Sequence, residues 1–163
     1  MREWMTVAAL LVAGCTPVEL RSRPVAQPEA APATGEAITL ATGPCFGTCP
    51  VYRVTIRADG SGTFEGQRFT EVTGTRAFTA DPATYRRFAA LLARYRPQGE
   101  RRIVMGSPDC PVAPTDMPSA QVSWGGRDTL DFYYGCRTGN EALATALRDA
   151  PALLPIAGFI KAK

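Results

Sequence analysis

The chain has 163 residues, which is enough for one ordinary domain with short appendages. Its net charge of +3 is too small to predict a nucleic-acid partner. The sequence contains no histidine, which excludes Ser-His-Asp and Cys-His catalysis and histidine-ligated zinc or copper within the chain. Acid–base chemistry near neutral pH would need a carboxylate, cysteine, lysine or tyrosine with a shifted pKa.

The N-terminal stretch MREWMTVAALLVAGC has the layout of a secretory signal. Its apolar run, residues 7–13, is too short to span a bilayer, which needs about 20 residues. The run ends in Val-Ala-Gly-Cys at residues 12–15, which resembles the bacterial lipobox. We therefore expect residues 1–14 to be removed as a lipoprotein signal peptide and the Cys15 thiol to be acylated. The alternative is a buried apolar helix with an incidental cysteine.

The lipobox also predicts a location in the bacterial cell envelope. Two or more acyl chains on Cys15 give stable membrane anchoring, at roughly 0.8 kcal/mol per buried CH₂. Residue 16 is threonine rather than the aspartate that commonly retains lipoproteins at the inner membrane. We therefore expect the periplasmic face of the outer membrane. Residues 15–36 are rich in Pro, Ala, Gln and Glu and sustain no apolar period, which predicts a partly extended tether.

A single domain is expected over residues 37–160. Residues 37–42 are a short strand candidate, and residues 51–57 alternate apolar and polar side chains as a half-buried strand does. Asp59-Gly60 predicts a hairpin turn into one or two further short strands. Residues 120–134 predict a second hairpin around a Gly-Gly turn.

Two helices are expected beside these strands. Asp81 is a suitable N-cap and Pro82 a suitable first residue for a helix that ends before Pro97. A second helix is expected from Asn140 to Asp149, and the proline-containing segment 97–118 is predicted as a loop. Because hairpin-linked strands form antiparallel sheets, we predict an α+β two-layer sandwich. It has an antiparallel sheet of about five to six strands with two helices on one face.

The four cysteines that follow Cys15 predict a disulfide framework, since even numbers in exported domains usually pair; they are Cys45, Cys49, Cys110 and Cys136. An extended chain places the first two about 13 Å apart, whereas a disulfide tolerates about 7 Å between Cα atoms. Their pairing needs a turn, which the neighbouring Gly and Pro residues allow. Sequence locality favours 45–49 with 110–136, and the crossed pairings stay open.

The stretch CFGTCP, residues 45–50, has two functional alternatives to a structural disulfide. A CxxxCP pattern is similar to that of copper-delivering thioredoxin-like lipoproteins, which place the pair before a helix and use a distant histidine. A thiol–disulfide exchanger normally carries Cys-x-x-Cys at a helix N-terminus. Here a strand pattern follows Pro50. We therefore expect a structural disulfide, with an envelope thiol-redox or copper-handling role of Cys45 and Cys49 as the alternative.

The stretch CFGTCPVYRVTIRADGSGTFEG resembles the opening of an uncharacterised bacterial domain family, a domain of unknown function. Its members start with a strand, then Cys-Phe-Gly-x-Cys-Pro-x-Tyr, then a strand and a glycine turn. The resemblance continues at TDMPS, residues 115–119, and ends at YYGC, residues 133–136. It covers about residues 37–160. Many members are predicted lipoproteins or exported proteins, so the resemblance implies domain boundaries and a location without an activity.

Few other residues are candidates for a binding or catalytic role. Asp116 is a candidate contact carboxylate or a turn cap, and Tyr133 is a candidate exposed aromatic contact. Asp128 and Asp131 are interpreted as solvent-face residues of a hairpin. The arginines at 86, 87, 94, 96, 101 and 102 are interpreted as a solvated helix face, with a basic patch for anionic envelope polymers or lipid headgroups as the alternative.

These observations predict a lipid-anchored binding or structural module with an envelope protein or polymer as its partner. No catalytic residue, metal ligand or cofactor is predicted. A second hypothesis is the thiol-redox or copper-handling protein described above. A third is an enzyme with a histidine-free carboxylate or tyrosine site.

Overall fold

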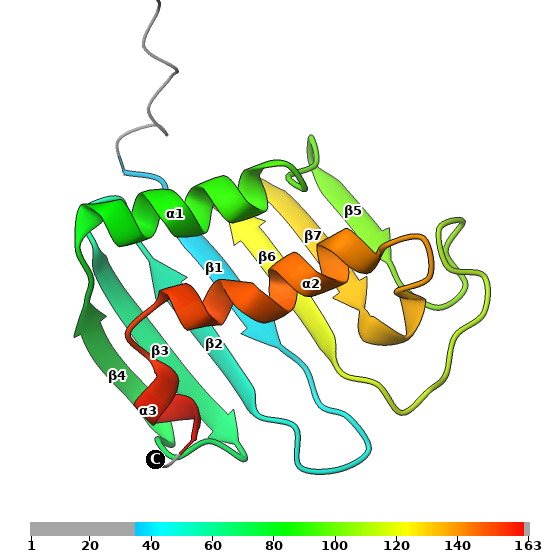
Figure 1. Cartoon of the computed structure of the whole chain (residues 1–163), viewed down its shortest axis with the longest axis horizontal. Coiled ribbons are helices and arrows are strands. Elements are labelled where there is room, and N and C mark those ends of the chain that lie inside the picture. The colour runs from blue at the N-terminus through cyan, green and yellow to red at the C-terminus, as the bar shows by residue number, and fades with distance from the viewer. Residues whose placement is uncertain (1–34, 162–163) are drawn as a thin grey trace, which may run out of the picture.

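The structure, a computed structural model, describes residues 35–161 and shows helices crossing one face of a seven-stranded sheet (Figure 1). The strand order is β4-β3-β2-β1-β6-β7-β5. The strands are β1 Ile38–Thr42, β2 Val51–Ile56, β3 Ser61–Arg68, β4 Gly74–Thr79, β5 Glu100–Ile103, β6 Ser119–Trp124 and β7 Asp128–Tyr133. The helices are α1 Pro82–Ala93, α2 Glu141–Asp149 and α3 Ala157–Ile160, with short 3₁₀ turns η1 Tyr134–Cys136 and η2 Ala150–Leu153.

The sheet is mixed, which corrects the prediction of an all-antiparallel sheet with five to six strands. Strand β5 lies inside the segment predicted as a loop and pairs with β7 in parallel, with Ile103 opposite Phe132. Its sequence ERRI has one buried residue, so it carries no alternating pattern to detect. The α+β class with the helices on one face is confirmed, and α3 adds a third, short helix.

The predicted hairpin turn at Asp59-Gly60 is confirmed between β2 and β3. The Asp59 carboxylate accepts hydrogen bonds from the Ser61 backbone N–H at 2.8 Å and from its hydroxyl at 2.7 Å, and these bonds lower the pKa of Asp59. Gly60 has a φ of 86°, and a Cβ there would lie 1.9 Å from the Ala80 carbonyl oxygen. Only glycine therefore fits this turn against the chain that leads into α1.

Helix α1 begins as its sequence predicts. The Asp81 carboxylate accepts a hydrogen bond from the Thr84 backbone N–H at 2.8 Å, and Pro82 occupies the first helical position. Tyr85, Phe88 and Leu92 face the sheet and are buried. The helix therefore covers the core with the apolar stripe expected from its spacing.

The core lies between the sheet and the helices. Its largest fully buried side chains include Trp124, Phe64 and Phe132 from the strands and Leu147 from α2. Strand β1 is central, so its two ends mark opposite ends of the sheet. We call the end where β1 begins, after Glu36, the tether end. We call the end where β1 finishes, at Thr42, the cavity end.

Antiparallel pairing brings three further strand termini to the cavity end. Thr42 lies opposite Ala120 near the start of β6, and Ser119 lies opposite Tyr133 at the end of β7. The Thr42 hydroxyl donates to the Pro50 carbonyl oxygen at 2.8 Å, which fixes the entry into β2. Segments that are far apart in sequence thus meet at one end of the sheet.

Candidate functional site

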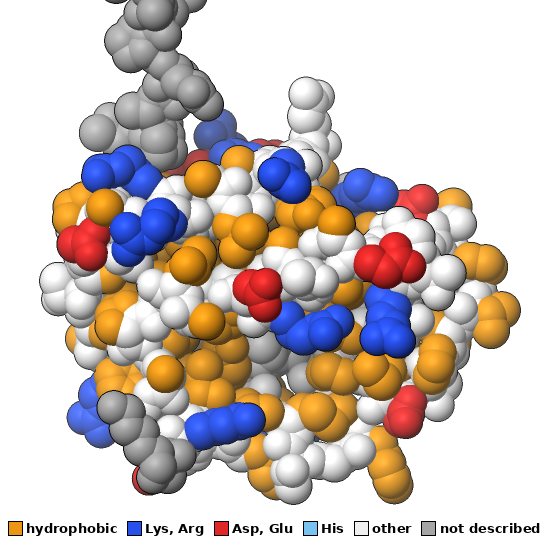
Figure 2. Space-filling model, in the orientation of Figure 1, with side chains coloured by type: hydrophobic (Ala, Val, Ile, Leu, Met, Phe, Trp, Pro, Cys, Tyr) orange, Lys and Arg blue, Asp and Glu red, His pale blue; other side chains and the backbone are white. Residues whose placement is uncertain are grey.

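A cavity of about 530 Å³ opens at the cavity end, between the sheet and the C-terminal segment that contains α2, η2 and α3. Figure 2 shows the helix-covered face, with a hollow below α2 and Lys or Arg side chains at its edge. The lining residues are Thr42, Cys49, Pro50, Tyr52, Met117, Pro118, Ser119, Tyr134, Arg137, Leu147, Arg148, Pro151, Ile160 and Lys161. The volume falls within the range of about 300–1,000 Å³ that is usual for small-molecule sites.

The charged residues that line the cavity all have the same sign. Arg137, Arg148 and Lys161 are exposed lining residues, and no Asp or Glu lines the cavity. Among residues 35–161, none of these three cations makes an ion pair within 4 Å. The Arg148 guanidinium lies 5.5 Å from the centroid of the Tyr134 ring. The cavity therefore combines an apolar lining with an unmatched positive charge.

Two tyrosines supply hydroxyl groups to the cavity. Tyr52 and Tyr134 are 6% and 8% exposed, and neither hydroxyl hydrogen-bonds to another described residue. Because the described part of the chain holds no fully buried polar side-chain atom without a partner, both hydroxyls are solvent-accessible, and both residues line the cavity. Desolvation raises the pKa of Tyr52, with a further contribution from Tyr134, and it raises the pKa of Tyr134 to about 12. Both groups are therefore neutral donors near pH 7.

Both predicted disulfides are present, and both lie at the cavity end. Cys45 is bonded to Cys49, with 5.7 Å between Cα atoms, in the loop that joins β1 to β2. Cys110 is bonded to Cys136, with 5.3 Å between Cα atoms, and ties the long loop before β6 to the turn after β7. The pairing favoured from the sequence is confirmed. Cys49 also lines the cavity, so the first disulfide forms part of its wall.

Of the two candidate contact residues, Asp116 lies in the loop before β6 and Tyr133 is the last residue of β7. The Tyr133 hydroxyl donates to the Pro114 carbonyl oxygen at 2.6 Å and accepts from the Met117 backbone N–H at 3.0 Å. It therefore fastens the proline-containing loop to β7. Asp116 is exposed, and its carbonyl oxygen accepts from the Phe46 N–H at 3.1 Å. Neither side chain lines the cavity.

The loop closed by Cys45 and Cys49 presents an exposed aromatic residue. Phe46 is 92% exposed, and Gly47 has a φ of 141° that completes the turn between the cysteines. Phe46 is held through its backbone by Asp116, so the two loops at this end support one another.

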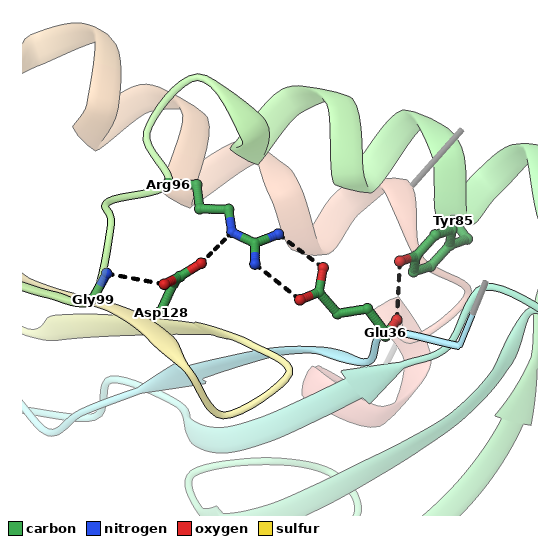
Figure 3. Close-up of polar contacts among 5 residues, drawn as sticks. All are labelled: Glu36, Tyr85, Arg96, Gly99 and Asp128. Carbon is green, nitrogen blue, oxygen red and sulfur yellow. Dashed lines mark hydrogen bonds and ion pairs between the residues drawn. The ribbon is translucent and has the colours of Figure 1, made fainter. Parts of the chain in front are cut away.

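A different polar network lies at the tether end (Figure 3). The Arg96 guanidinium donates to both oxygens of Glu36, at 2.8 and 2.9 Å, and to Asp128 at 2.6 Å. Asp128 also accepts from the Gly99 N–H at 2.9 Å, and the Tyr85 hydroxyl donates to the Glu36 carbonyl oxygen at 3.0 Å. The backbone bond from Gly99 and the ion pair with Arg96 lower the pKa of Asp128.

This network corrects two sequence interpretations. Asp128 is an ion-pairing residue rather than a solvent-face residue, and Arg96 lies beyond α1 in a paired site rather than on a solvated helix face. Arg101 and Arg102 are also paired, with Asp109 at 3.0 Å and with Asp131 at 3.3 Å. The six arginines therefore do not act as one unpaired basic patch.

Several predictions concern residues outside the described range. The signal peptide 1–14, the acylated Cys15 and nearly all of the tether fall before residue 35. Within residues 35–161, no helix is long and apolar enough to cross a bilayer. In the same range, no three His, Cys, Asp or Glu residues gather in an arrangement that suits a metal ion.

Comparison with known families decides where the domain belongs. The family described as "Domain of unknown function (DUF6438)" matches residues 36–153. The chain belongs to this family. No curated protein and no solved structure matches the chain significantly. The DUF6438 match covers every strand, the whole of α1 and α2, and both disulfides. Helix α3 and the cavity-lining residues Ile160 and Lys161 lie beyond the matched residues.

Sequence reasoning missed the residues that make the cavity distinctive. Tyr52 reads as an ordinary inward-facing strand residue, and Arg137 and Arg148 read as surface charges near a helix. The only signal in the sequence was the position of these two arginines, since Arg137 lies shortly after β7 and Arg148 lies within α2. The sequence gives no indication that the segment after β7, helix α2 and the loop after β1 line the same cavity.

Proposed function

We propose that this chain is a lipid-anchored protein of the bacterial cell envelope whose DUF6438 domain is a disulfide-stabilised binding module. We further propose that its ligand enters the cavity beside α2. The lipobox ending at Cys15 supports the anchor, and the two disulfides suit an oxidising compartment. An outer-membrane location follows from Thr16 and belongs to the same proposal.

The observation that carries the binding role is the unmatched polar character of the cavity. The hydroxyls of the buried Tyr52 and Tyr134 have no partner among residues 35–161 and open onto a recess. Groups arranged in this way are available to a ligand, while the apolar residues around them supply the contact area.

The anchor is tested by the intact mass of the mature chain taken from membranes. The proposal predicts a chain that begins at Cys15 and carries the added mass of acyl groups. An unacylated Cys15, or a retained residue 1–14 segment, contradicts it.

The binding role is tested by ligand-observed NMR with a panel of small apolar and amphipathic compounds on the oxidised full-length chain. Ile160→Trp places a large side chain in the cavity, and Ala157→Trp is the matched control, since Ala157 is exposed on the same helix and does not line the cavity. We expect saturable binding that Ile160→Trp abolishes and Ala157→Trp preserves. Binding of no compound, or equal binding by both variants, contradicts the role.

A second candidate function is thiol redox or copper handling by Cys45 and Cys49. It is favoured by one observation: this disulfide is partly exposed, and Cys49 faces the cavity. Quantification of thiols after mild reduction, followed by copper titration of the reduced chain, tests it. A Cys45–Cys49 bond that resists mild reductant, together with a reduced chain that binds no copper, contradicts it.

A further inference from the structure

We infer that the ligand of the cavity is a small amphipathic carboxylate, with an aliphatic body inside and its carboxylate at the cationic mouth. This inference rests on the proposed binding role and names the class of ligand. It is carried by three independent features of the cavity, which are the sign of its charges, the apolar character of its walls and the position of its hydroxyl donors.

The charges select an anion. Arg137, Arg148 and Lys161 line the cavity without an acidic lining residue. Two carboxylates lie nearby without lining the cavity: Glu141 accepts from the Gly139 N–H at 3.0 Å, and Asp149 is close enough to Tyr134 to raise the pKa of its hydroxyl. A cationic ligand would meet repulsion here, and a neutral ligand would leave the guanidinium groups unmatched. Guanidinium groups bind carboxylates in a planar, bidentate manner, which gives both affinity and orientation.

The apolar residues that line the cavity favour an anion that carries an aliphatic chain. Pro50, Pro118 and Pro151 line the cavity together with Leu147 and Ile160. An inorganic anion such as phosphate would contact little of this surface. A cavity of about 530 Å³ has room for a drug-sized ligand, so octanoate, with its ten non-hydrogen atoms, fits inside it as a soluble probe of this ligand class. The apolar contact then adds the hydrophobic contribution that a free ion lacks.

The hydroxyls place donors inside the cavity as well as at its mouth. Tyr52 and Tyr134 lie close enough for the two side chains to interact electrostatically, and Arg148 lies over the Tyr134 ring. Neutral hydroxyls donate hydrogen bonds to a carboxylate oxygen without repelling the apolar body. Together with Arg148 they add donors to the cavity wall, and no Asp or Glu lines the cavity.

The experiment measures affinities of four soluble probes by calorimetry. It uses the oxidised full-length chain with Cys15→Ser, so that no acyl chain of its own competes. The probes are octanoate, 1-octanol, octylammonium and inorganic phosphate. We expect saturable octanoate binding with one site, at least tenfold weaker binding of 1-octanol, and no measurable binding of octylammonium or phosphate. The double variant Arg137→Gln/Arg148→Gln should weaken octanoate binding at least tenfold and leave 1-octanol binding unchanged.

The matched control is Arg86→Gln/Arg94→Gln, which removes two exposed arginines of the α1 segment away from the cavity and should leave octanoate affinity within twofold. Equal affinity for octanoate and 1-octanol, or a double variant that binds octanoate like the parent, overturns the inference while the cavity remains a binding site. A chain that binds anionic phosphatidylglycerol vesicles but not octanoate also overturns it, because the anion would then be a lipid headgroup. If no compound of the NMR panel binds, the proposed binding role itself fails.

Discussion

The two ends of the sheet satisfy their polar groups in opposite ways. At the tether end, Arg96 is matched by two carboxylates, Asp128 has a second donor in Gly99, and the Tyr85 hydroxyl has an acceptor. At the cavity end, the guanidinium groups of Arg137 and Arg148 and the hydroxyls of Tyr52 and Tyr134 have no such partners among the described residues. The difference indicates that the tether end is built for structural integrity and the cavity end for an external partner.

The two ends also differ in what holds them together. The tether end relies on an ion-pair and hydrogen-bond network around Glu36, the point where the proposed tether enters the fold. The cavity end relies on two covalent bonds, which fix the loops without using the cations or tyrosine hydroxyls that line the opening. A site with unmatched polar groups is costly to hold in shape, and disulfides stabilise it by restricting the unfolded chain.

The largest expected effect comes from removing the covalent bonds of the cavity end. Cys110→Ser/Cys136→Ser should lower the free energy of unfolding by about 3.5 kcal/mol, because the bond closes a long loop, and Cys45→Ser/Cys49→Ser by about 2 kcal/mol. Chemical denaturation under non-reducing conditions measures both values. The prediction is contradicted if the two double variants lose equal unfolding free energy, or if loss of the Cys45–Cys49 bond costs more than loss of the Cys110–Cys136 bond.

A smaller effect is expected when the tether-end network is broken. Arg96→Leu leaves two carboxylates without their cation, and it should lower the free energy of unfolding by about 1–2 kcal/mol, between the values for exposed and buried pairs. Arg86→Leu is the control on the exposed side of α1 and should change stability by less than about 0.5 kcal/mol. Indistinguishable urea midpoints for the two variants would contradict a structural role of the network.

The network also predicts a dependence of stability on pH. The pKa of Asp128 is lowered in the folded state, so its contribution is fully present above the unfolded carboxyl pKa of about 4 and is lost as pH falls through the lower folded pKa. Asp128→Asn lacks this contribution. The stability difference between parent and variant should therefore be largest near pH 6 and shrink toward pH 2. Urea midpoints across this range measure it, and a difference that is constant with pH refutes the prediction.

The smallest expected change in stability belongs to the cavity cations. Arg148→Gln removes a guanidinium group that has no ion pair among residues 35–161, and it should alter the free energy of unfolding by less than about 0.5 kcal/mol, or raise it slightly by relieving repulsion from Arg137. Thermal melts of the oxidised chain measure the change. A loss comparable to that of Arg96→Leu would show that Arg148 has a structural partner after all.

The sequence predicted the features that local patterns encode. Period-two alternation identified β2, the Asp59-Gly60 pair its turn, and Asp81-Pro82 the start of α1. Sequence locality favoured the disulfide pairing that the structure contains, although the crossed pairings stayed open. The strand, the turn and the helix start depend on residues that are neighbours in the chain, so a single sequence contains enough information to find them.

The features that depend on distant pairing were not predictable. Strand β5 has one buried residue and is defined by its partner β7, and Glu36 was assigned to the tether because its ion pair with Arg96 spans 60 positions. The cavity requires the ends of β1 and β7 to meet α2, which only the sheet order fixes. The interpretation of Asp128 was wrong for the same reason, because no residue near it in the sequence indicates that Arg96 is its partner.

The most direct test of the contrast between the two ends is to measure octanoate affinity and unfolding free energy on the same two proteins, Arg96→Leu and Arg137→Gln/Arg148→Gln. The account predicts that Arg96→Leu loses stability and binds octanoate like the parent. It predicts that the double variant keeps its stability and binds octanoate at least tenfold more weakly. A double variant that loses stability but not affinity would contradict the account, because the cavity cations would then be structural.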